Sequence, residues 1–179
     1  MTESTIHTKS VFEGRLIRLE VLDVELEDGT RTTREIVRHP GAVAVVAQLP
    51  DDRLLFVRQY RKPVEQFMIE VIAGTREPGE DPVACARREV EEETGHRASD
   101  MRRLGSIYPS PGYVDEEICV FAARVAPADT TCEPDEDERV EPVVLTMDEI
   151  HRKVRDNEIR DAKTLAAWHM FLNANLSAT

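Results

Sequence analysis

Cysteine is scarce in this chain of 179 residues, and long apolar runs are missing. The three cysteines, Cys85, Cys119 and Cys132, are odd in number, lie far apart and lack C-x-x-C spacing, which argues against a disulfide framework and a zinc site. No stretch approaches the roughly 20 apolar residues that a membrane helix needs. Residues 1–9 are polar, so we expect neither a signal peptide nor a membrane anchor there. A reducing cytoplasm is the simplest location.

Aromatic residues make up only 5% of the sequence, so few side chains are available to stack on a flat ring. Phe12, Tyr60 and Tyr113 are the candidates, although such residues are more often part of a core than of a binding surface. Trp168 and Phe171 lie in the last predicted helix and are expected in the core. The sequence contains no internal repeat or low-complexity tract.

Acidic residues outnumber basic ones, and the formal net charge is -12. A field of this sign repels anions, so nucleic acid is not expected as a partner. A phosphate-bearing ligand would need local arginines and bound divalent cations to invert the field at its site. With 41% hydrophobic and 32% charged residues, the chain fits one globular domain with an appendage.

Short antiparallel strands are the pattern of the first part of the chain, because alternating segments are separated by turn residues such as Asp28-Gly29. We expect strands at 16–26, 32–38, 42–48, 54–58 and 68–72. Further strands are expected at 103–108, 118–125 and 140–145, with an acidic loop at 131–138. Together with a few helices, these strands predict an α/β (α+β) fold in which a mixed sheet lies between helices.

The strongest helix signal follows Gly79. Asp81 can cap the first turn and Pro82 suits the first helical position, while Gly95 suits the left-handed position after the end. A second helix begins at the capping box formed by Thr146 and Glu149 and runs towards residue 155. The last helix is expected at 161–173.

Four glutamates crowd the last turns of the first helix: Glu89, Glu91, Glu92 and Glu93. Negative charge is disfavoured there by the helix dipole and by like charges one turn apart. Glu89 and Glu93 lie about 40° apart around the helix and border its apolar stripe. That stripe consists of Val83, Ala86, Val90 and Thr94. A hard cation such as Mg²⁺ would neutralise the pair; the alternative is a solvated helix end in which Arg87 and Arg88 pair with the acids.

The spacing around this helix resembles the Nudix box, G-x5-E-x7-R-E-U-x-E-E-x-G-U, where U is a bulky apolar residue. Its fixed positions hold Gly74, Glu80, Arg88, Glu89, Val90, Glu92, Glu93 and Gly95. The last U position holds His96 instead, which concerns local packing and not a metal ligand. The resemblance implies a loop-helix-loop on an α/β/α sandwich and binding of Mg²⁺, with Mn²⁺ as the alternative.

The resemblance also implies roles for single residues. The metal ligands would be the carbonyl oxygen of Ala73 and the carboxylates of Glu89, Glu92 and Glu93. Glu92 would be a ligand itself or would lie directly behind the ligands. The resemblance also implies catalytic roles for Glu92 and Arg88. Arg88 and Glu80 would orient the carboxylates through an ion pair and hydrogen bonds.

Beyond the box, the chain is similar to the ADP-ribose pyrophosphatase branch of the family. In that branch a proline follows the last glycine of the box by about sixteen residues, as Pro111 follows Gly95, and Pro111 is assigned to the substrate site. Glu116 matches the family position near the attacking water and is the candidate general base. Asp115 and Glu117 are the alternatives for that role.

Arg58 and Arg61 follow a predicted strand and are candidates to bind the diphosphate or the terminal ribose, because a guanidinium group matches an oxyanion with two parallel hydrogen bonds. Surface salt bridges are the alternative for both. Glu70 resembles a family position close to substrate and metal.

The N-terminal hairpins resemble a segment that members of this branch exchange between two subunits, which implies a homodimer. Arg34 and Glu35 would then recognise the adenine of the partner's ligand. We therefore expect a β extension for dimerisation at 1–38 and a Nudix domain at 39–179.

The implied activity is Mg²⁺-dependent hydrolysis of the pyrophosphate bond of ADP-ribose to AMP and ribose 5-phosphate. Metal ions would lower the pKa of the attacking water and neutralise phosphate oxygens. Another nucleoside diphosphate sugar, such as GDP-mannose, or a dinucleotide offers the same bond and is the alternative substrate. A non-catalytic module that senses a nucleotide is the third hypothesis, and the complete box argues against it.

Overall fold

A computed structural model of the chain describes residues 2–127 and 140–176. The predicted acidic loop at 131–138 and Cys132 lie outside these residues. The chain divides into two compact units: Met1–Gly41 with Tyr108–Glu117, and Ala42–Ile107 with Ile118–Thr179. Within the described part of the chain, no helix has the length and apolar character needed to cross a membrane.

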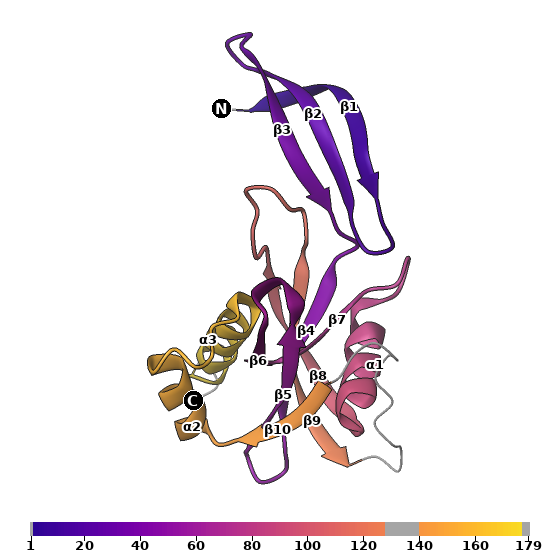
Figure 1. The fold of residues 1–179 in the computed structure, drawn as a ribbon. Helices are drawn as coiled ribbons and strands as arrows, with labels where there is room; N and C mark the ends of the chain where they lie inside the picture. Colours follow the sequence, from indigo (N-terminus) through magenta and orange to yellow (C-terminus); the bar gives the residue numbers. More distant parts are fainter. Residues whose placement is uncertain (1, 128–139, 177–179) are drawn as a thin grey trace. The chain divides into compact units, whose positions relative to one another are not determined.

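The first unit contains a three-stranded antiparallel sheet with the order β1-β2-β3 (Figure 1). Its strands are Glu3–Glu13, Arg18–Leu26 and Arg31–Arg38. The sequence predicted β2 and β3 but not β1. Every residue of β1 is exposed, so the strand has no buried face from which a pattern could be recognised, and its pairing with β2 defines it instead.

This sheet buries few apolar side chains. Leu22 and Val24 on β2 are 9% and 2% exposed. Four large apolar residues of the same unit are between 50% and 54% exposed: Ile6, Val11, Phe12 and Leu16. Tyr113 is also exposed, at 58%. The expectation that Phe12 and Tyr113 belong to a core is therefore wrong for the single chain.

The second unit is built on a mixed sheet with the order β10-β5-β4-β9-β8, in which β6 also pairs with β5 and β7 with β4. The strands are Ala42–Gln48 (β4), Leu54–Arg61 (β5), Gln66–Glu70 (β6), Ile72–Thr75 (β7), His96–Ile107 (β8), Ile118–Pro127 (β9) and Val140–Leu145 (β10). The β4–β9 pair is parallel and the other pairs are antiparallel. The predicted mixed sheet is confirmed.

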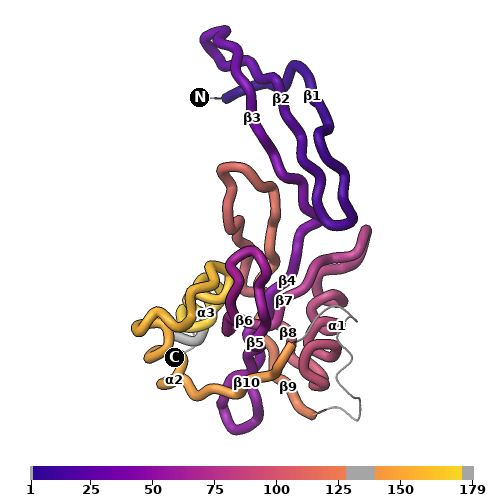
Figure 2. The backbone as a smooth tube through the Cα atoms, in the orientation of Figure 1, coloured from indigo at the N-terminus to yellow at the C-terminus, as the bar shows by residue number. Residues whose placement is uncertain are grey.

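Helices cover both faces of this sheet, as the ribbon and the tube show (Figures 1 and 2). One face carries α1 (Pro82–Thr94), and the other carries α2 (Met147–Arg155) and α3 (Ala162–Leu176). The core on the α1 side includes Val43, Val45, Ile72, Ala86 and Val90. The core on the opposite side includes Ala44, Val46, Phe56, Ile150, Trp168 and Phe171. Alternate residues of β4 thus enter the two cores, and the unit is the expected α/β/α sandwich.

The main differences from the predicted strands are at β6–β7 and at the start of β8. The strand expected at 68–72 is divided into β6 and β7 at Val71, because β6 pairs with β5 whereas β7 pairs with β4. β8 begins at His96, directly after α1, instead of at residue 103. Between β5 and β6 the chain forms a short 3-10 helix at Lys62–Val64. These boundaries depend on sheet partners that are distant in sequence, which a local pattern does not encode.

The ends of α1 lie where the sequence predicted them. The Asp81 carboxylate accepts hydrogen bonds from two amides of the first turn, at 3.0 Å and 3.1 Å, and Gly95 adopts a φ of 65° after the last turn. The capping box of Thr146 and Glu149 is also present on α2. Val83 was expected in the apolar stripe but is 37% exposed, because it lies in the first turn, before the buried part of α1 begins.

Candidate active site

Gly74 lies on β7, just before the loop that leads to α1, and the carboxyl group of Glu89 packs against its backbone. A Cβ atom built on Gly74 would lie 1.9 Å from Cδ of Glu89 and 2.0 Å and 2.2 Å from the two carboxylate oxygens. A side chain would displace that carboxylate. The first glycine of the box therefore makes room for a candidate metal ligand.

Arg88 contacts three carboxylates of the box. Its Nε donates to Oε1 of Glu80 at 3.1 Å and its Nη1 donates to Oε2 of Glu92 at 2.8 Å. Nη1 also lies 2.7 Å from Oε1 of Glu89. The hydrogen bond from Arg88 lowers the pKa of Glu80 to about 2, and the same bond raises the pKa of Arg88 above its usual range. One guanidinium group thus fixes the positions of three acids.

The candidate metal ligands differ in burial. Glu93 and Glu89 are 3% and 9% exposed, whereas the side chain of Glu92 is 43% exposed. Buried carboxylates are costly unless positive charge compensates them. Carboxylate oxygens, with the carbonyl oxygen of Ala73 beside Gly74, are the donors that a hard divalent cation prefers. The residues present therefore fit Mg²⁺ or Mn²⁺.

These acids do not form a ready-made metal cluster. In residues 2–127 and 140–176, no group of three or more His, Cys, Asp or Glu side chains is arranged to hold a metal ion. Glu89 and Glu92 share the guanidinium group of Arg88, which places a positive charge beside both carboxylates.

Glu70, the last residue of β6, is buried with two cations around it. The residue is 1% exposed. Nε and Nη2 of Arg61 donate to its two carboxylate oxygens at 2.9 Å and 2.8 Å, and Nζ of Lys163 on α3 donates to Oε2. Burial raises the pKa of Glu70, but the hydrogen bonds and charges of Arg61 and Lys163 outweigh burial, so the pKa is lowered.

Arg58 and its neighbours form a partly exposed cluster on β5 and β6. The Arg58 guanidinium lies 3.8 Å from the centre of the Phe67 ring, and its Nη1 donates to Glu141 at 3.0 Å. Tyr60 meets Phe67 edge to face at 5.4 Å. Tyr60 is 44% exposed, so the expectation that it belongs to the core is wrong.

In the first unit, the loop with the candidate base is attached to the end of β3. The Val37 amide donates to the carbonyl oxygen of Tyr113 at 2.8 Å, and the Asp115 amide donates to the carbonyl oxygen of Val37 at 3.2 Å. Val37 and Val114 thereby form a parallel bridge. Pro111 lies in the same loop, at its turn, and is exposed.

The three acids of this loop are not equivalent. Asp115 accepts hydrogen bonds from the amide of His39 at 2.9 Å and from Nη1 of Arg38 at 3.0 Å. Arg38 also donates to Glu20 on β2 at 2.8 Å. Oε1 of Glu116 lies 3.7 Å from Nδ1 of His39. Asp115 is therefore engaged in holding the loop, which leaves Glu116 and Glu117 as the candidates for proton transfer.

Arg34 and Glu35 lie on β3. The guanidinium of Arg34 donates to both carboxylate oxygens of Glu3 on β1, at 3.2 Å and 2.7 Å. Glu35 pairs with Val21 in the backbone register of β2 and β3 and is exposed. The Arg34 contact joins the two outer strands of the sheet across β2.

The structure thus gathers the predicted residues into separate groups. Glu89 and Glu92 meet at Arg88, and Arg61 meets Glu70. Sequence reasoning missed Lys163, Arg38 and His39, which contact predicted residues. A signal for the region of Lys163 was present in the sequence, because Asp161 precedes a helix and accepts the amide of Thr164 at 2.9 Å, as an N-cap residue does.

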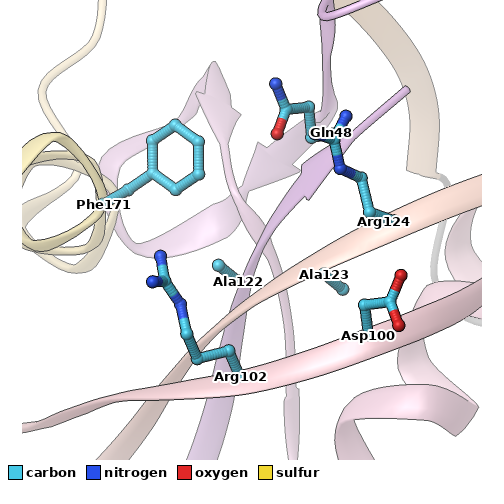
Figure 3. A pocket seen from close by; sticks show the side chains of 7 residues that line it. All are labelled: Gln48, Asp100, Arg102, Ala122, Ala123, Arg124 and Phe171. Carbon is cyan, nitrogen blue, oxygen red and sulfur yellow. The ribbon is translucent and has the colours of Figure 1, made fainter. Parts of the chain in front are cut away.

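A shallow hollow of about 250 Å³ lies elsewhere on the second unit (Figure 3). It is lined by Gln48, Asp100, Arg102, Ala122, Ala123, Arg124 and Phe171. Gln48 and Arg124 both donate to Asp52, at 3.0 Å and 3.4 Å. None of the predicted site residues lines this hollow.

Comparison with known families agrees with the box and the fold. The NUDIX domain model matches residues 38–168. The chain therefore belongs to the Nudix family. A crystal structure of an ADP compounds hydrolase superposes with a TM-score of 0.85 over 99% of this chain and 96% of that chain, at 24% identity, and this likeness shows the fold.

Relatives of known name cover nearly the whole chain. The chain is 45% identical over 166 residues to the methanol dehydrogenase activator of Bacillus methanolicus, which is 92% of this chain and 90% of that protein. It is 42% identical over 168 residues to the ADP-ribose pyrophosphatase of Bacillus subtilis, which is 93% and 91% of the two chains. A GDP-mannose pyrophosphatase of Cronobacter sakazakii is 33% identical over 77% of this chain and 80% of its own length.

Proposed function

We propose that this protein hydrolyses the pyrophosphate bond of ADP-ribose to AMP and ribose 5-phosphate, in a reaction that depends on Mg²⁺. The observation that carries the proposal is the complete box, in which Gly74 leaves room for Glu89 and Arg88 holds Glu80, Glu89 and Glu92. Similarity over 93% of the chain to an ADP-ribose pyrophosphatase supports this choice of substrate.

The metal ligands in this proposal are Glu89, Glu92, Glu93 and the carbonyl oxygen of Ala73. When bound, Mg²⁺, or Mn²⁺ in its place, would lower the pKa of a water molecule and neutralise phosphate oxygens. Glu89 and Glu93 are buried beside the core, where a bound cation would compensate their charge. Arg88 contacts the carboxylates of Glu89 and Glu92.

The chain's own cations and loop acids complete the proposed mechanism. Arg61 and Arg58 bind the oxygens of the diphosphate and the terminal ribose, and Glu70 sets the orientation of Arg61. Glu116 accepts the proton of the attacking water, and Pro111 shapes the loop that carries it. The contacts of Asp115 with Arg38 and His39 support this assignment.

A homodimer in the cytoplasm is part of the proposal. Residues 1–38 would form the dimerisation segment and residues 39–179 the Nudix domain, with Arg34 and Glu35 recognising adenine in the partner subunit. The half-exposed Ile6, Val11 and Phe12 support a role for this sheet in association.

A hydrolase of another nucleoside diphosphate sugar is the second candidate, because a relative that covers 77% of the chain is named for GDP-mannose. Steady-state rates with ADP-ribose, GDP-mannose, other nucleotide sugars and dinucleotides, at a fixed Mg²⁺ concentration, separate the candidates. We expect the highest kcat/KM for ADP-ribose. A preference above about tenfold for a substrate without adenine would remove ADP-ribose, since a tenfold ratio corresponds to about 1.4 kcal/mol of discrimination.

The ligand role of Glu93 is tested by Glu93→Gln, with Glu91→Gln as the control on the same helix turn. We expect Glu93→Gln to lower the Mg²⁺-dependent rate by more than about 100-fold, because loss of a metal ligand should cost at least as much as loss of a group that orients one. Glu91→Gln should retain the wild-type rate. An unchanged rate in Glu93→Gln would show that the ligand assignment is wrong. Absence of turnover on every substrate would instead favour a nucleotide-sensing module.

A further inference from the structure

Lys163 belongs to a charged group that links α3 to the candidate site. Glu70 accepts hydrogen bonds from Arg61 and Lys163, and Lys163 also donates to Oδ2 of Asp161 at 3.0 Å. The formal charges of these four residues, Glu70, Asp161, Arg61 and Lys163, sum to zero. The group is therefore neutral, and its positive charges compensate the almost completely buried carboxylate of Glu70.

The two cations differ in their access to solvent. The side chain of Arg61 is 36% exposed, whereas that of Lys163 is 13% exposed. Arg61 can therefore reach an incoming oxyanion, while Lys163 lies on the inner side of the group. If Arg61 turned towards a diphosphate without Lys163 in place, Glu70 would be left as a buried charge with no cation, which is strongly unfavourable.

We propose that Lys163 is a positioning residue that keeps Glu70 compensated while Arg61 binds the diphosphate of the substrate. This inference rests on the proposed function. Lys163 shares the negative charge of Glu70, so Glu70 holds Arg61 less tightly and Arg61 is available to the ligand. Asp161 in turn fixes the ammonium group of Lys163 on its other side.

The first turn of α3 also holds the chain between β6 and β7. The Val71 amide donates to Oγ1 of Thr164 at 3.0 Å, and this hydroxyl donates to Oδ2 of Asp161 at 2.6 Å. The same carboxylate oxygen thus receives hydrogen bonds from Lys163 and from the group that anchors Val71. Val71 directly follows Glu70 and lies two residues before Ala73. The first turn of α3 therefore supports both the acid that holds Arg61 and the strand with the candidate carbonyl ligand.

Lys163→Met tests the proposal through the separation of KM from kcat. Without Lys163, Glu70 retains only Arg61, and the competition between Glu70 and the diphosphate for that guanidinium increases. We expect KM for ADP-ribose at saturating Mg²⁺ to rise by about tenfold, as loss of one charge-assisted contact would produce, while kcat changes by less than about threefold. Lys163→Arg keeps the positive charge and should restore KM to within about threefold of wild type.

Lys153→Met is the matched control. Lys153 on α2 has a similarly buried side chain, 17% exposed, and also pairs with a glutamate, Glu158. It does not contact Glu70, so KM should stay at the wild-type value even if loss of the ion pair lowers stability. Thermal unfolding of all variants shows whether a change in KM accompanies a general loss of folding.

A double variant makes the charge argument specific. In Glu70→Gln there is no buried negative charge to compensate, so adding Lys163→Met to that background should leave KM unchanged, although the same substitution raises it in the wild type. Equal effects of Lys163→Met in both backgrounds would overturn the proposal, as would an unchanged KM in Lys163→Met alone. If wild-type protein hydrolyses no nucleoside diphosphate at all, the proposed function has failed, which is a distinct result.

Discussion

The space at Gly74 decides where the carboxylate of Glu89 can lie. A methyl group on Gly74 would occupy the position of that carboxylate, but Glu89 can move the end of its side chain away. We therefore expect Gly74→Ala to change the free energy of unfolding by less than about 1 kcal/mol. The apparent affinity for Mg²⁺ and kcat/KM should fall by about 10 to 100-fold, the range seen when ligand orientation is lost. Metal titrations of activity and urea unfolding measure the two effects.

Gly112→Ala is the control for this substitution, because an added Cβ at Gly112 meets no atom within 4 Å. Its free energy of unfolding should match that of wild type. If Gly74→Ala lost stability and activity in equal measure, Gly74 would serve the fold and not the placement of Glu89.

The pair of Glu80 and Arg88 predicts a pH dependence of stability. Arg88 lowers the pKa of Glu80 from 4.5 to about 2 in the folded protein. A depressed pKa in the folded state contributes stability that is fully present above the unfolded pKa and is lost as the pH falls through the folded pKa. We expect Glu80→Gln to destabilise the protein most above about pH 4.5, and the difference from wild type to shrink towards pH 2. Urea unfolding of both proteins across this range is the measurement, and a difference independent of pH would contradict it.

Candidate site residues could be predicted where they occupy fixed positions of the family motif. They could not be predicted where only the folded chain brings them into contact. Gly74, Glu89 and Glu93 follow from the box itself. Lys163 contacts Glu70 across 93 positions of sequence, and Arg38 contacts Asp115 across 77. Asp161 marks the start of the helix that carries Lys163, but no local pattern identifies either cation as the partner of a distant acid.

At the scale of elements, the loop with Glu116 depends on the contacts that Asp115 makes at the end of β3. Asp115→Ala removes the acceptor for Arg38 and for the His39 amide. We expect faster hydrogen exchange at the amides of Val37 and Asp115, because local opening becomes easier, and a fall in kcat of about tenfold as Glu116 loses its fixed position. Hydrogen exchange followed by mass spectrometry, together with steady-state rates, tests both.

Asp51→Ala is the matched control for that experiment. Asp51 also pairs with an arginine, Arg53, at 2.7 Å, but in the turn between β4 and β5. Its removal should leave exchange in residues 108–117 unchanged. Unchanged exchange in Asp115→Ala would mean that the backbone bridge of Val37 and Val114 holds the loop without the side-chain contacts.

Helices with local start and stop signals were predictable, and so were apolar strands such as β4 and β9, whereas β1 and the division between β6 and β7 were not. Asp81 and Gly95 mark α1, and the capping box marks α2, because these residues form hydrogen bonds within their own helix. β1 has no buried face, and the break between β6 and β7 at Val71 reflects a change of sheet partner. For such elements, tertiary pairing outweighs local preference.

At the scale of the whole molecule, the sequence predicted the sandwich of the second unit, but it did not predict which segments make up the first unit. The loop at Tyr108–Glu117 belongs to the same compact unit as the N-terminal sheet, because Val37 pairs with Val114 across a long stretch of sequence. A resemblance in sequence assigned Glu116 to the catalytic residues, yet it gave no reason to connect that residue with β3. The contacts of Arg38 and His39 supply the connection.

The N-terminal sheet predicts the oligomeric state. Three strands with only Leu22 and Val24 buried have little core of their own, and a sheet of this size needs an apolar face covered to be stable. If a second copy covers it, the protein of 20.3 kDa should sediment at about twice that mass, and Phe12→Ser should shift it towards the monomer by removing apolar area from the contact. Val144→Ser, at a residue 40% exposed on β10 of the other unit, should leave the dimer intact. If the wild-type protein were a monomer that hydrolyses ADP-ribose, the sheet would be stable without a second copy. The proposal that Arg34 and Glu35 recognise adenine in a partner subunit would then be wrong.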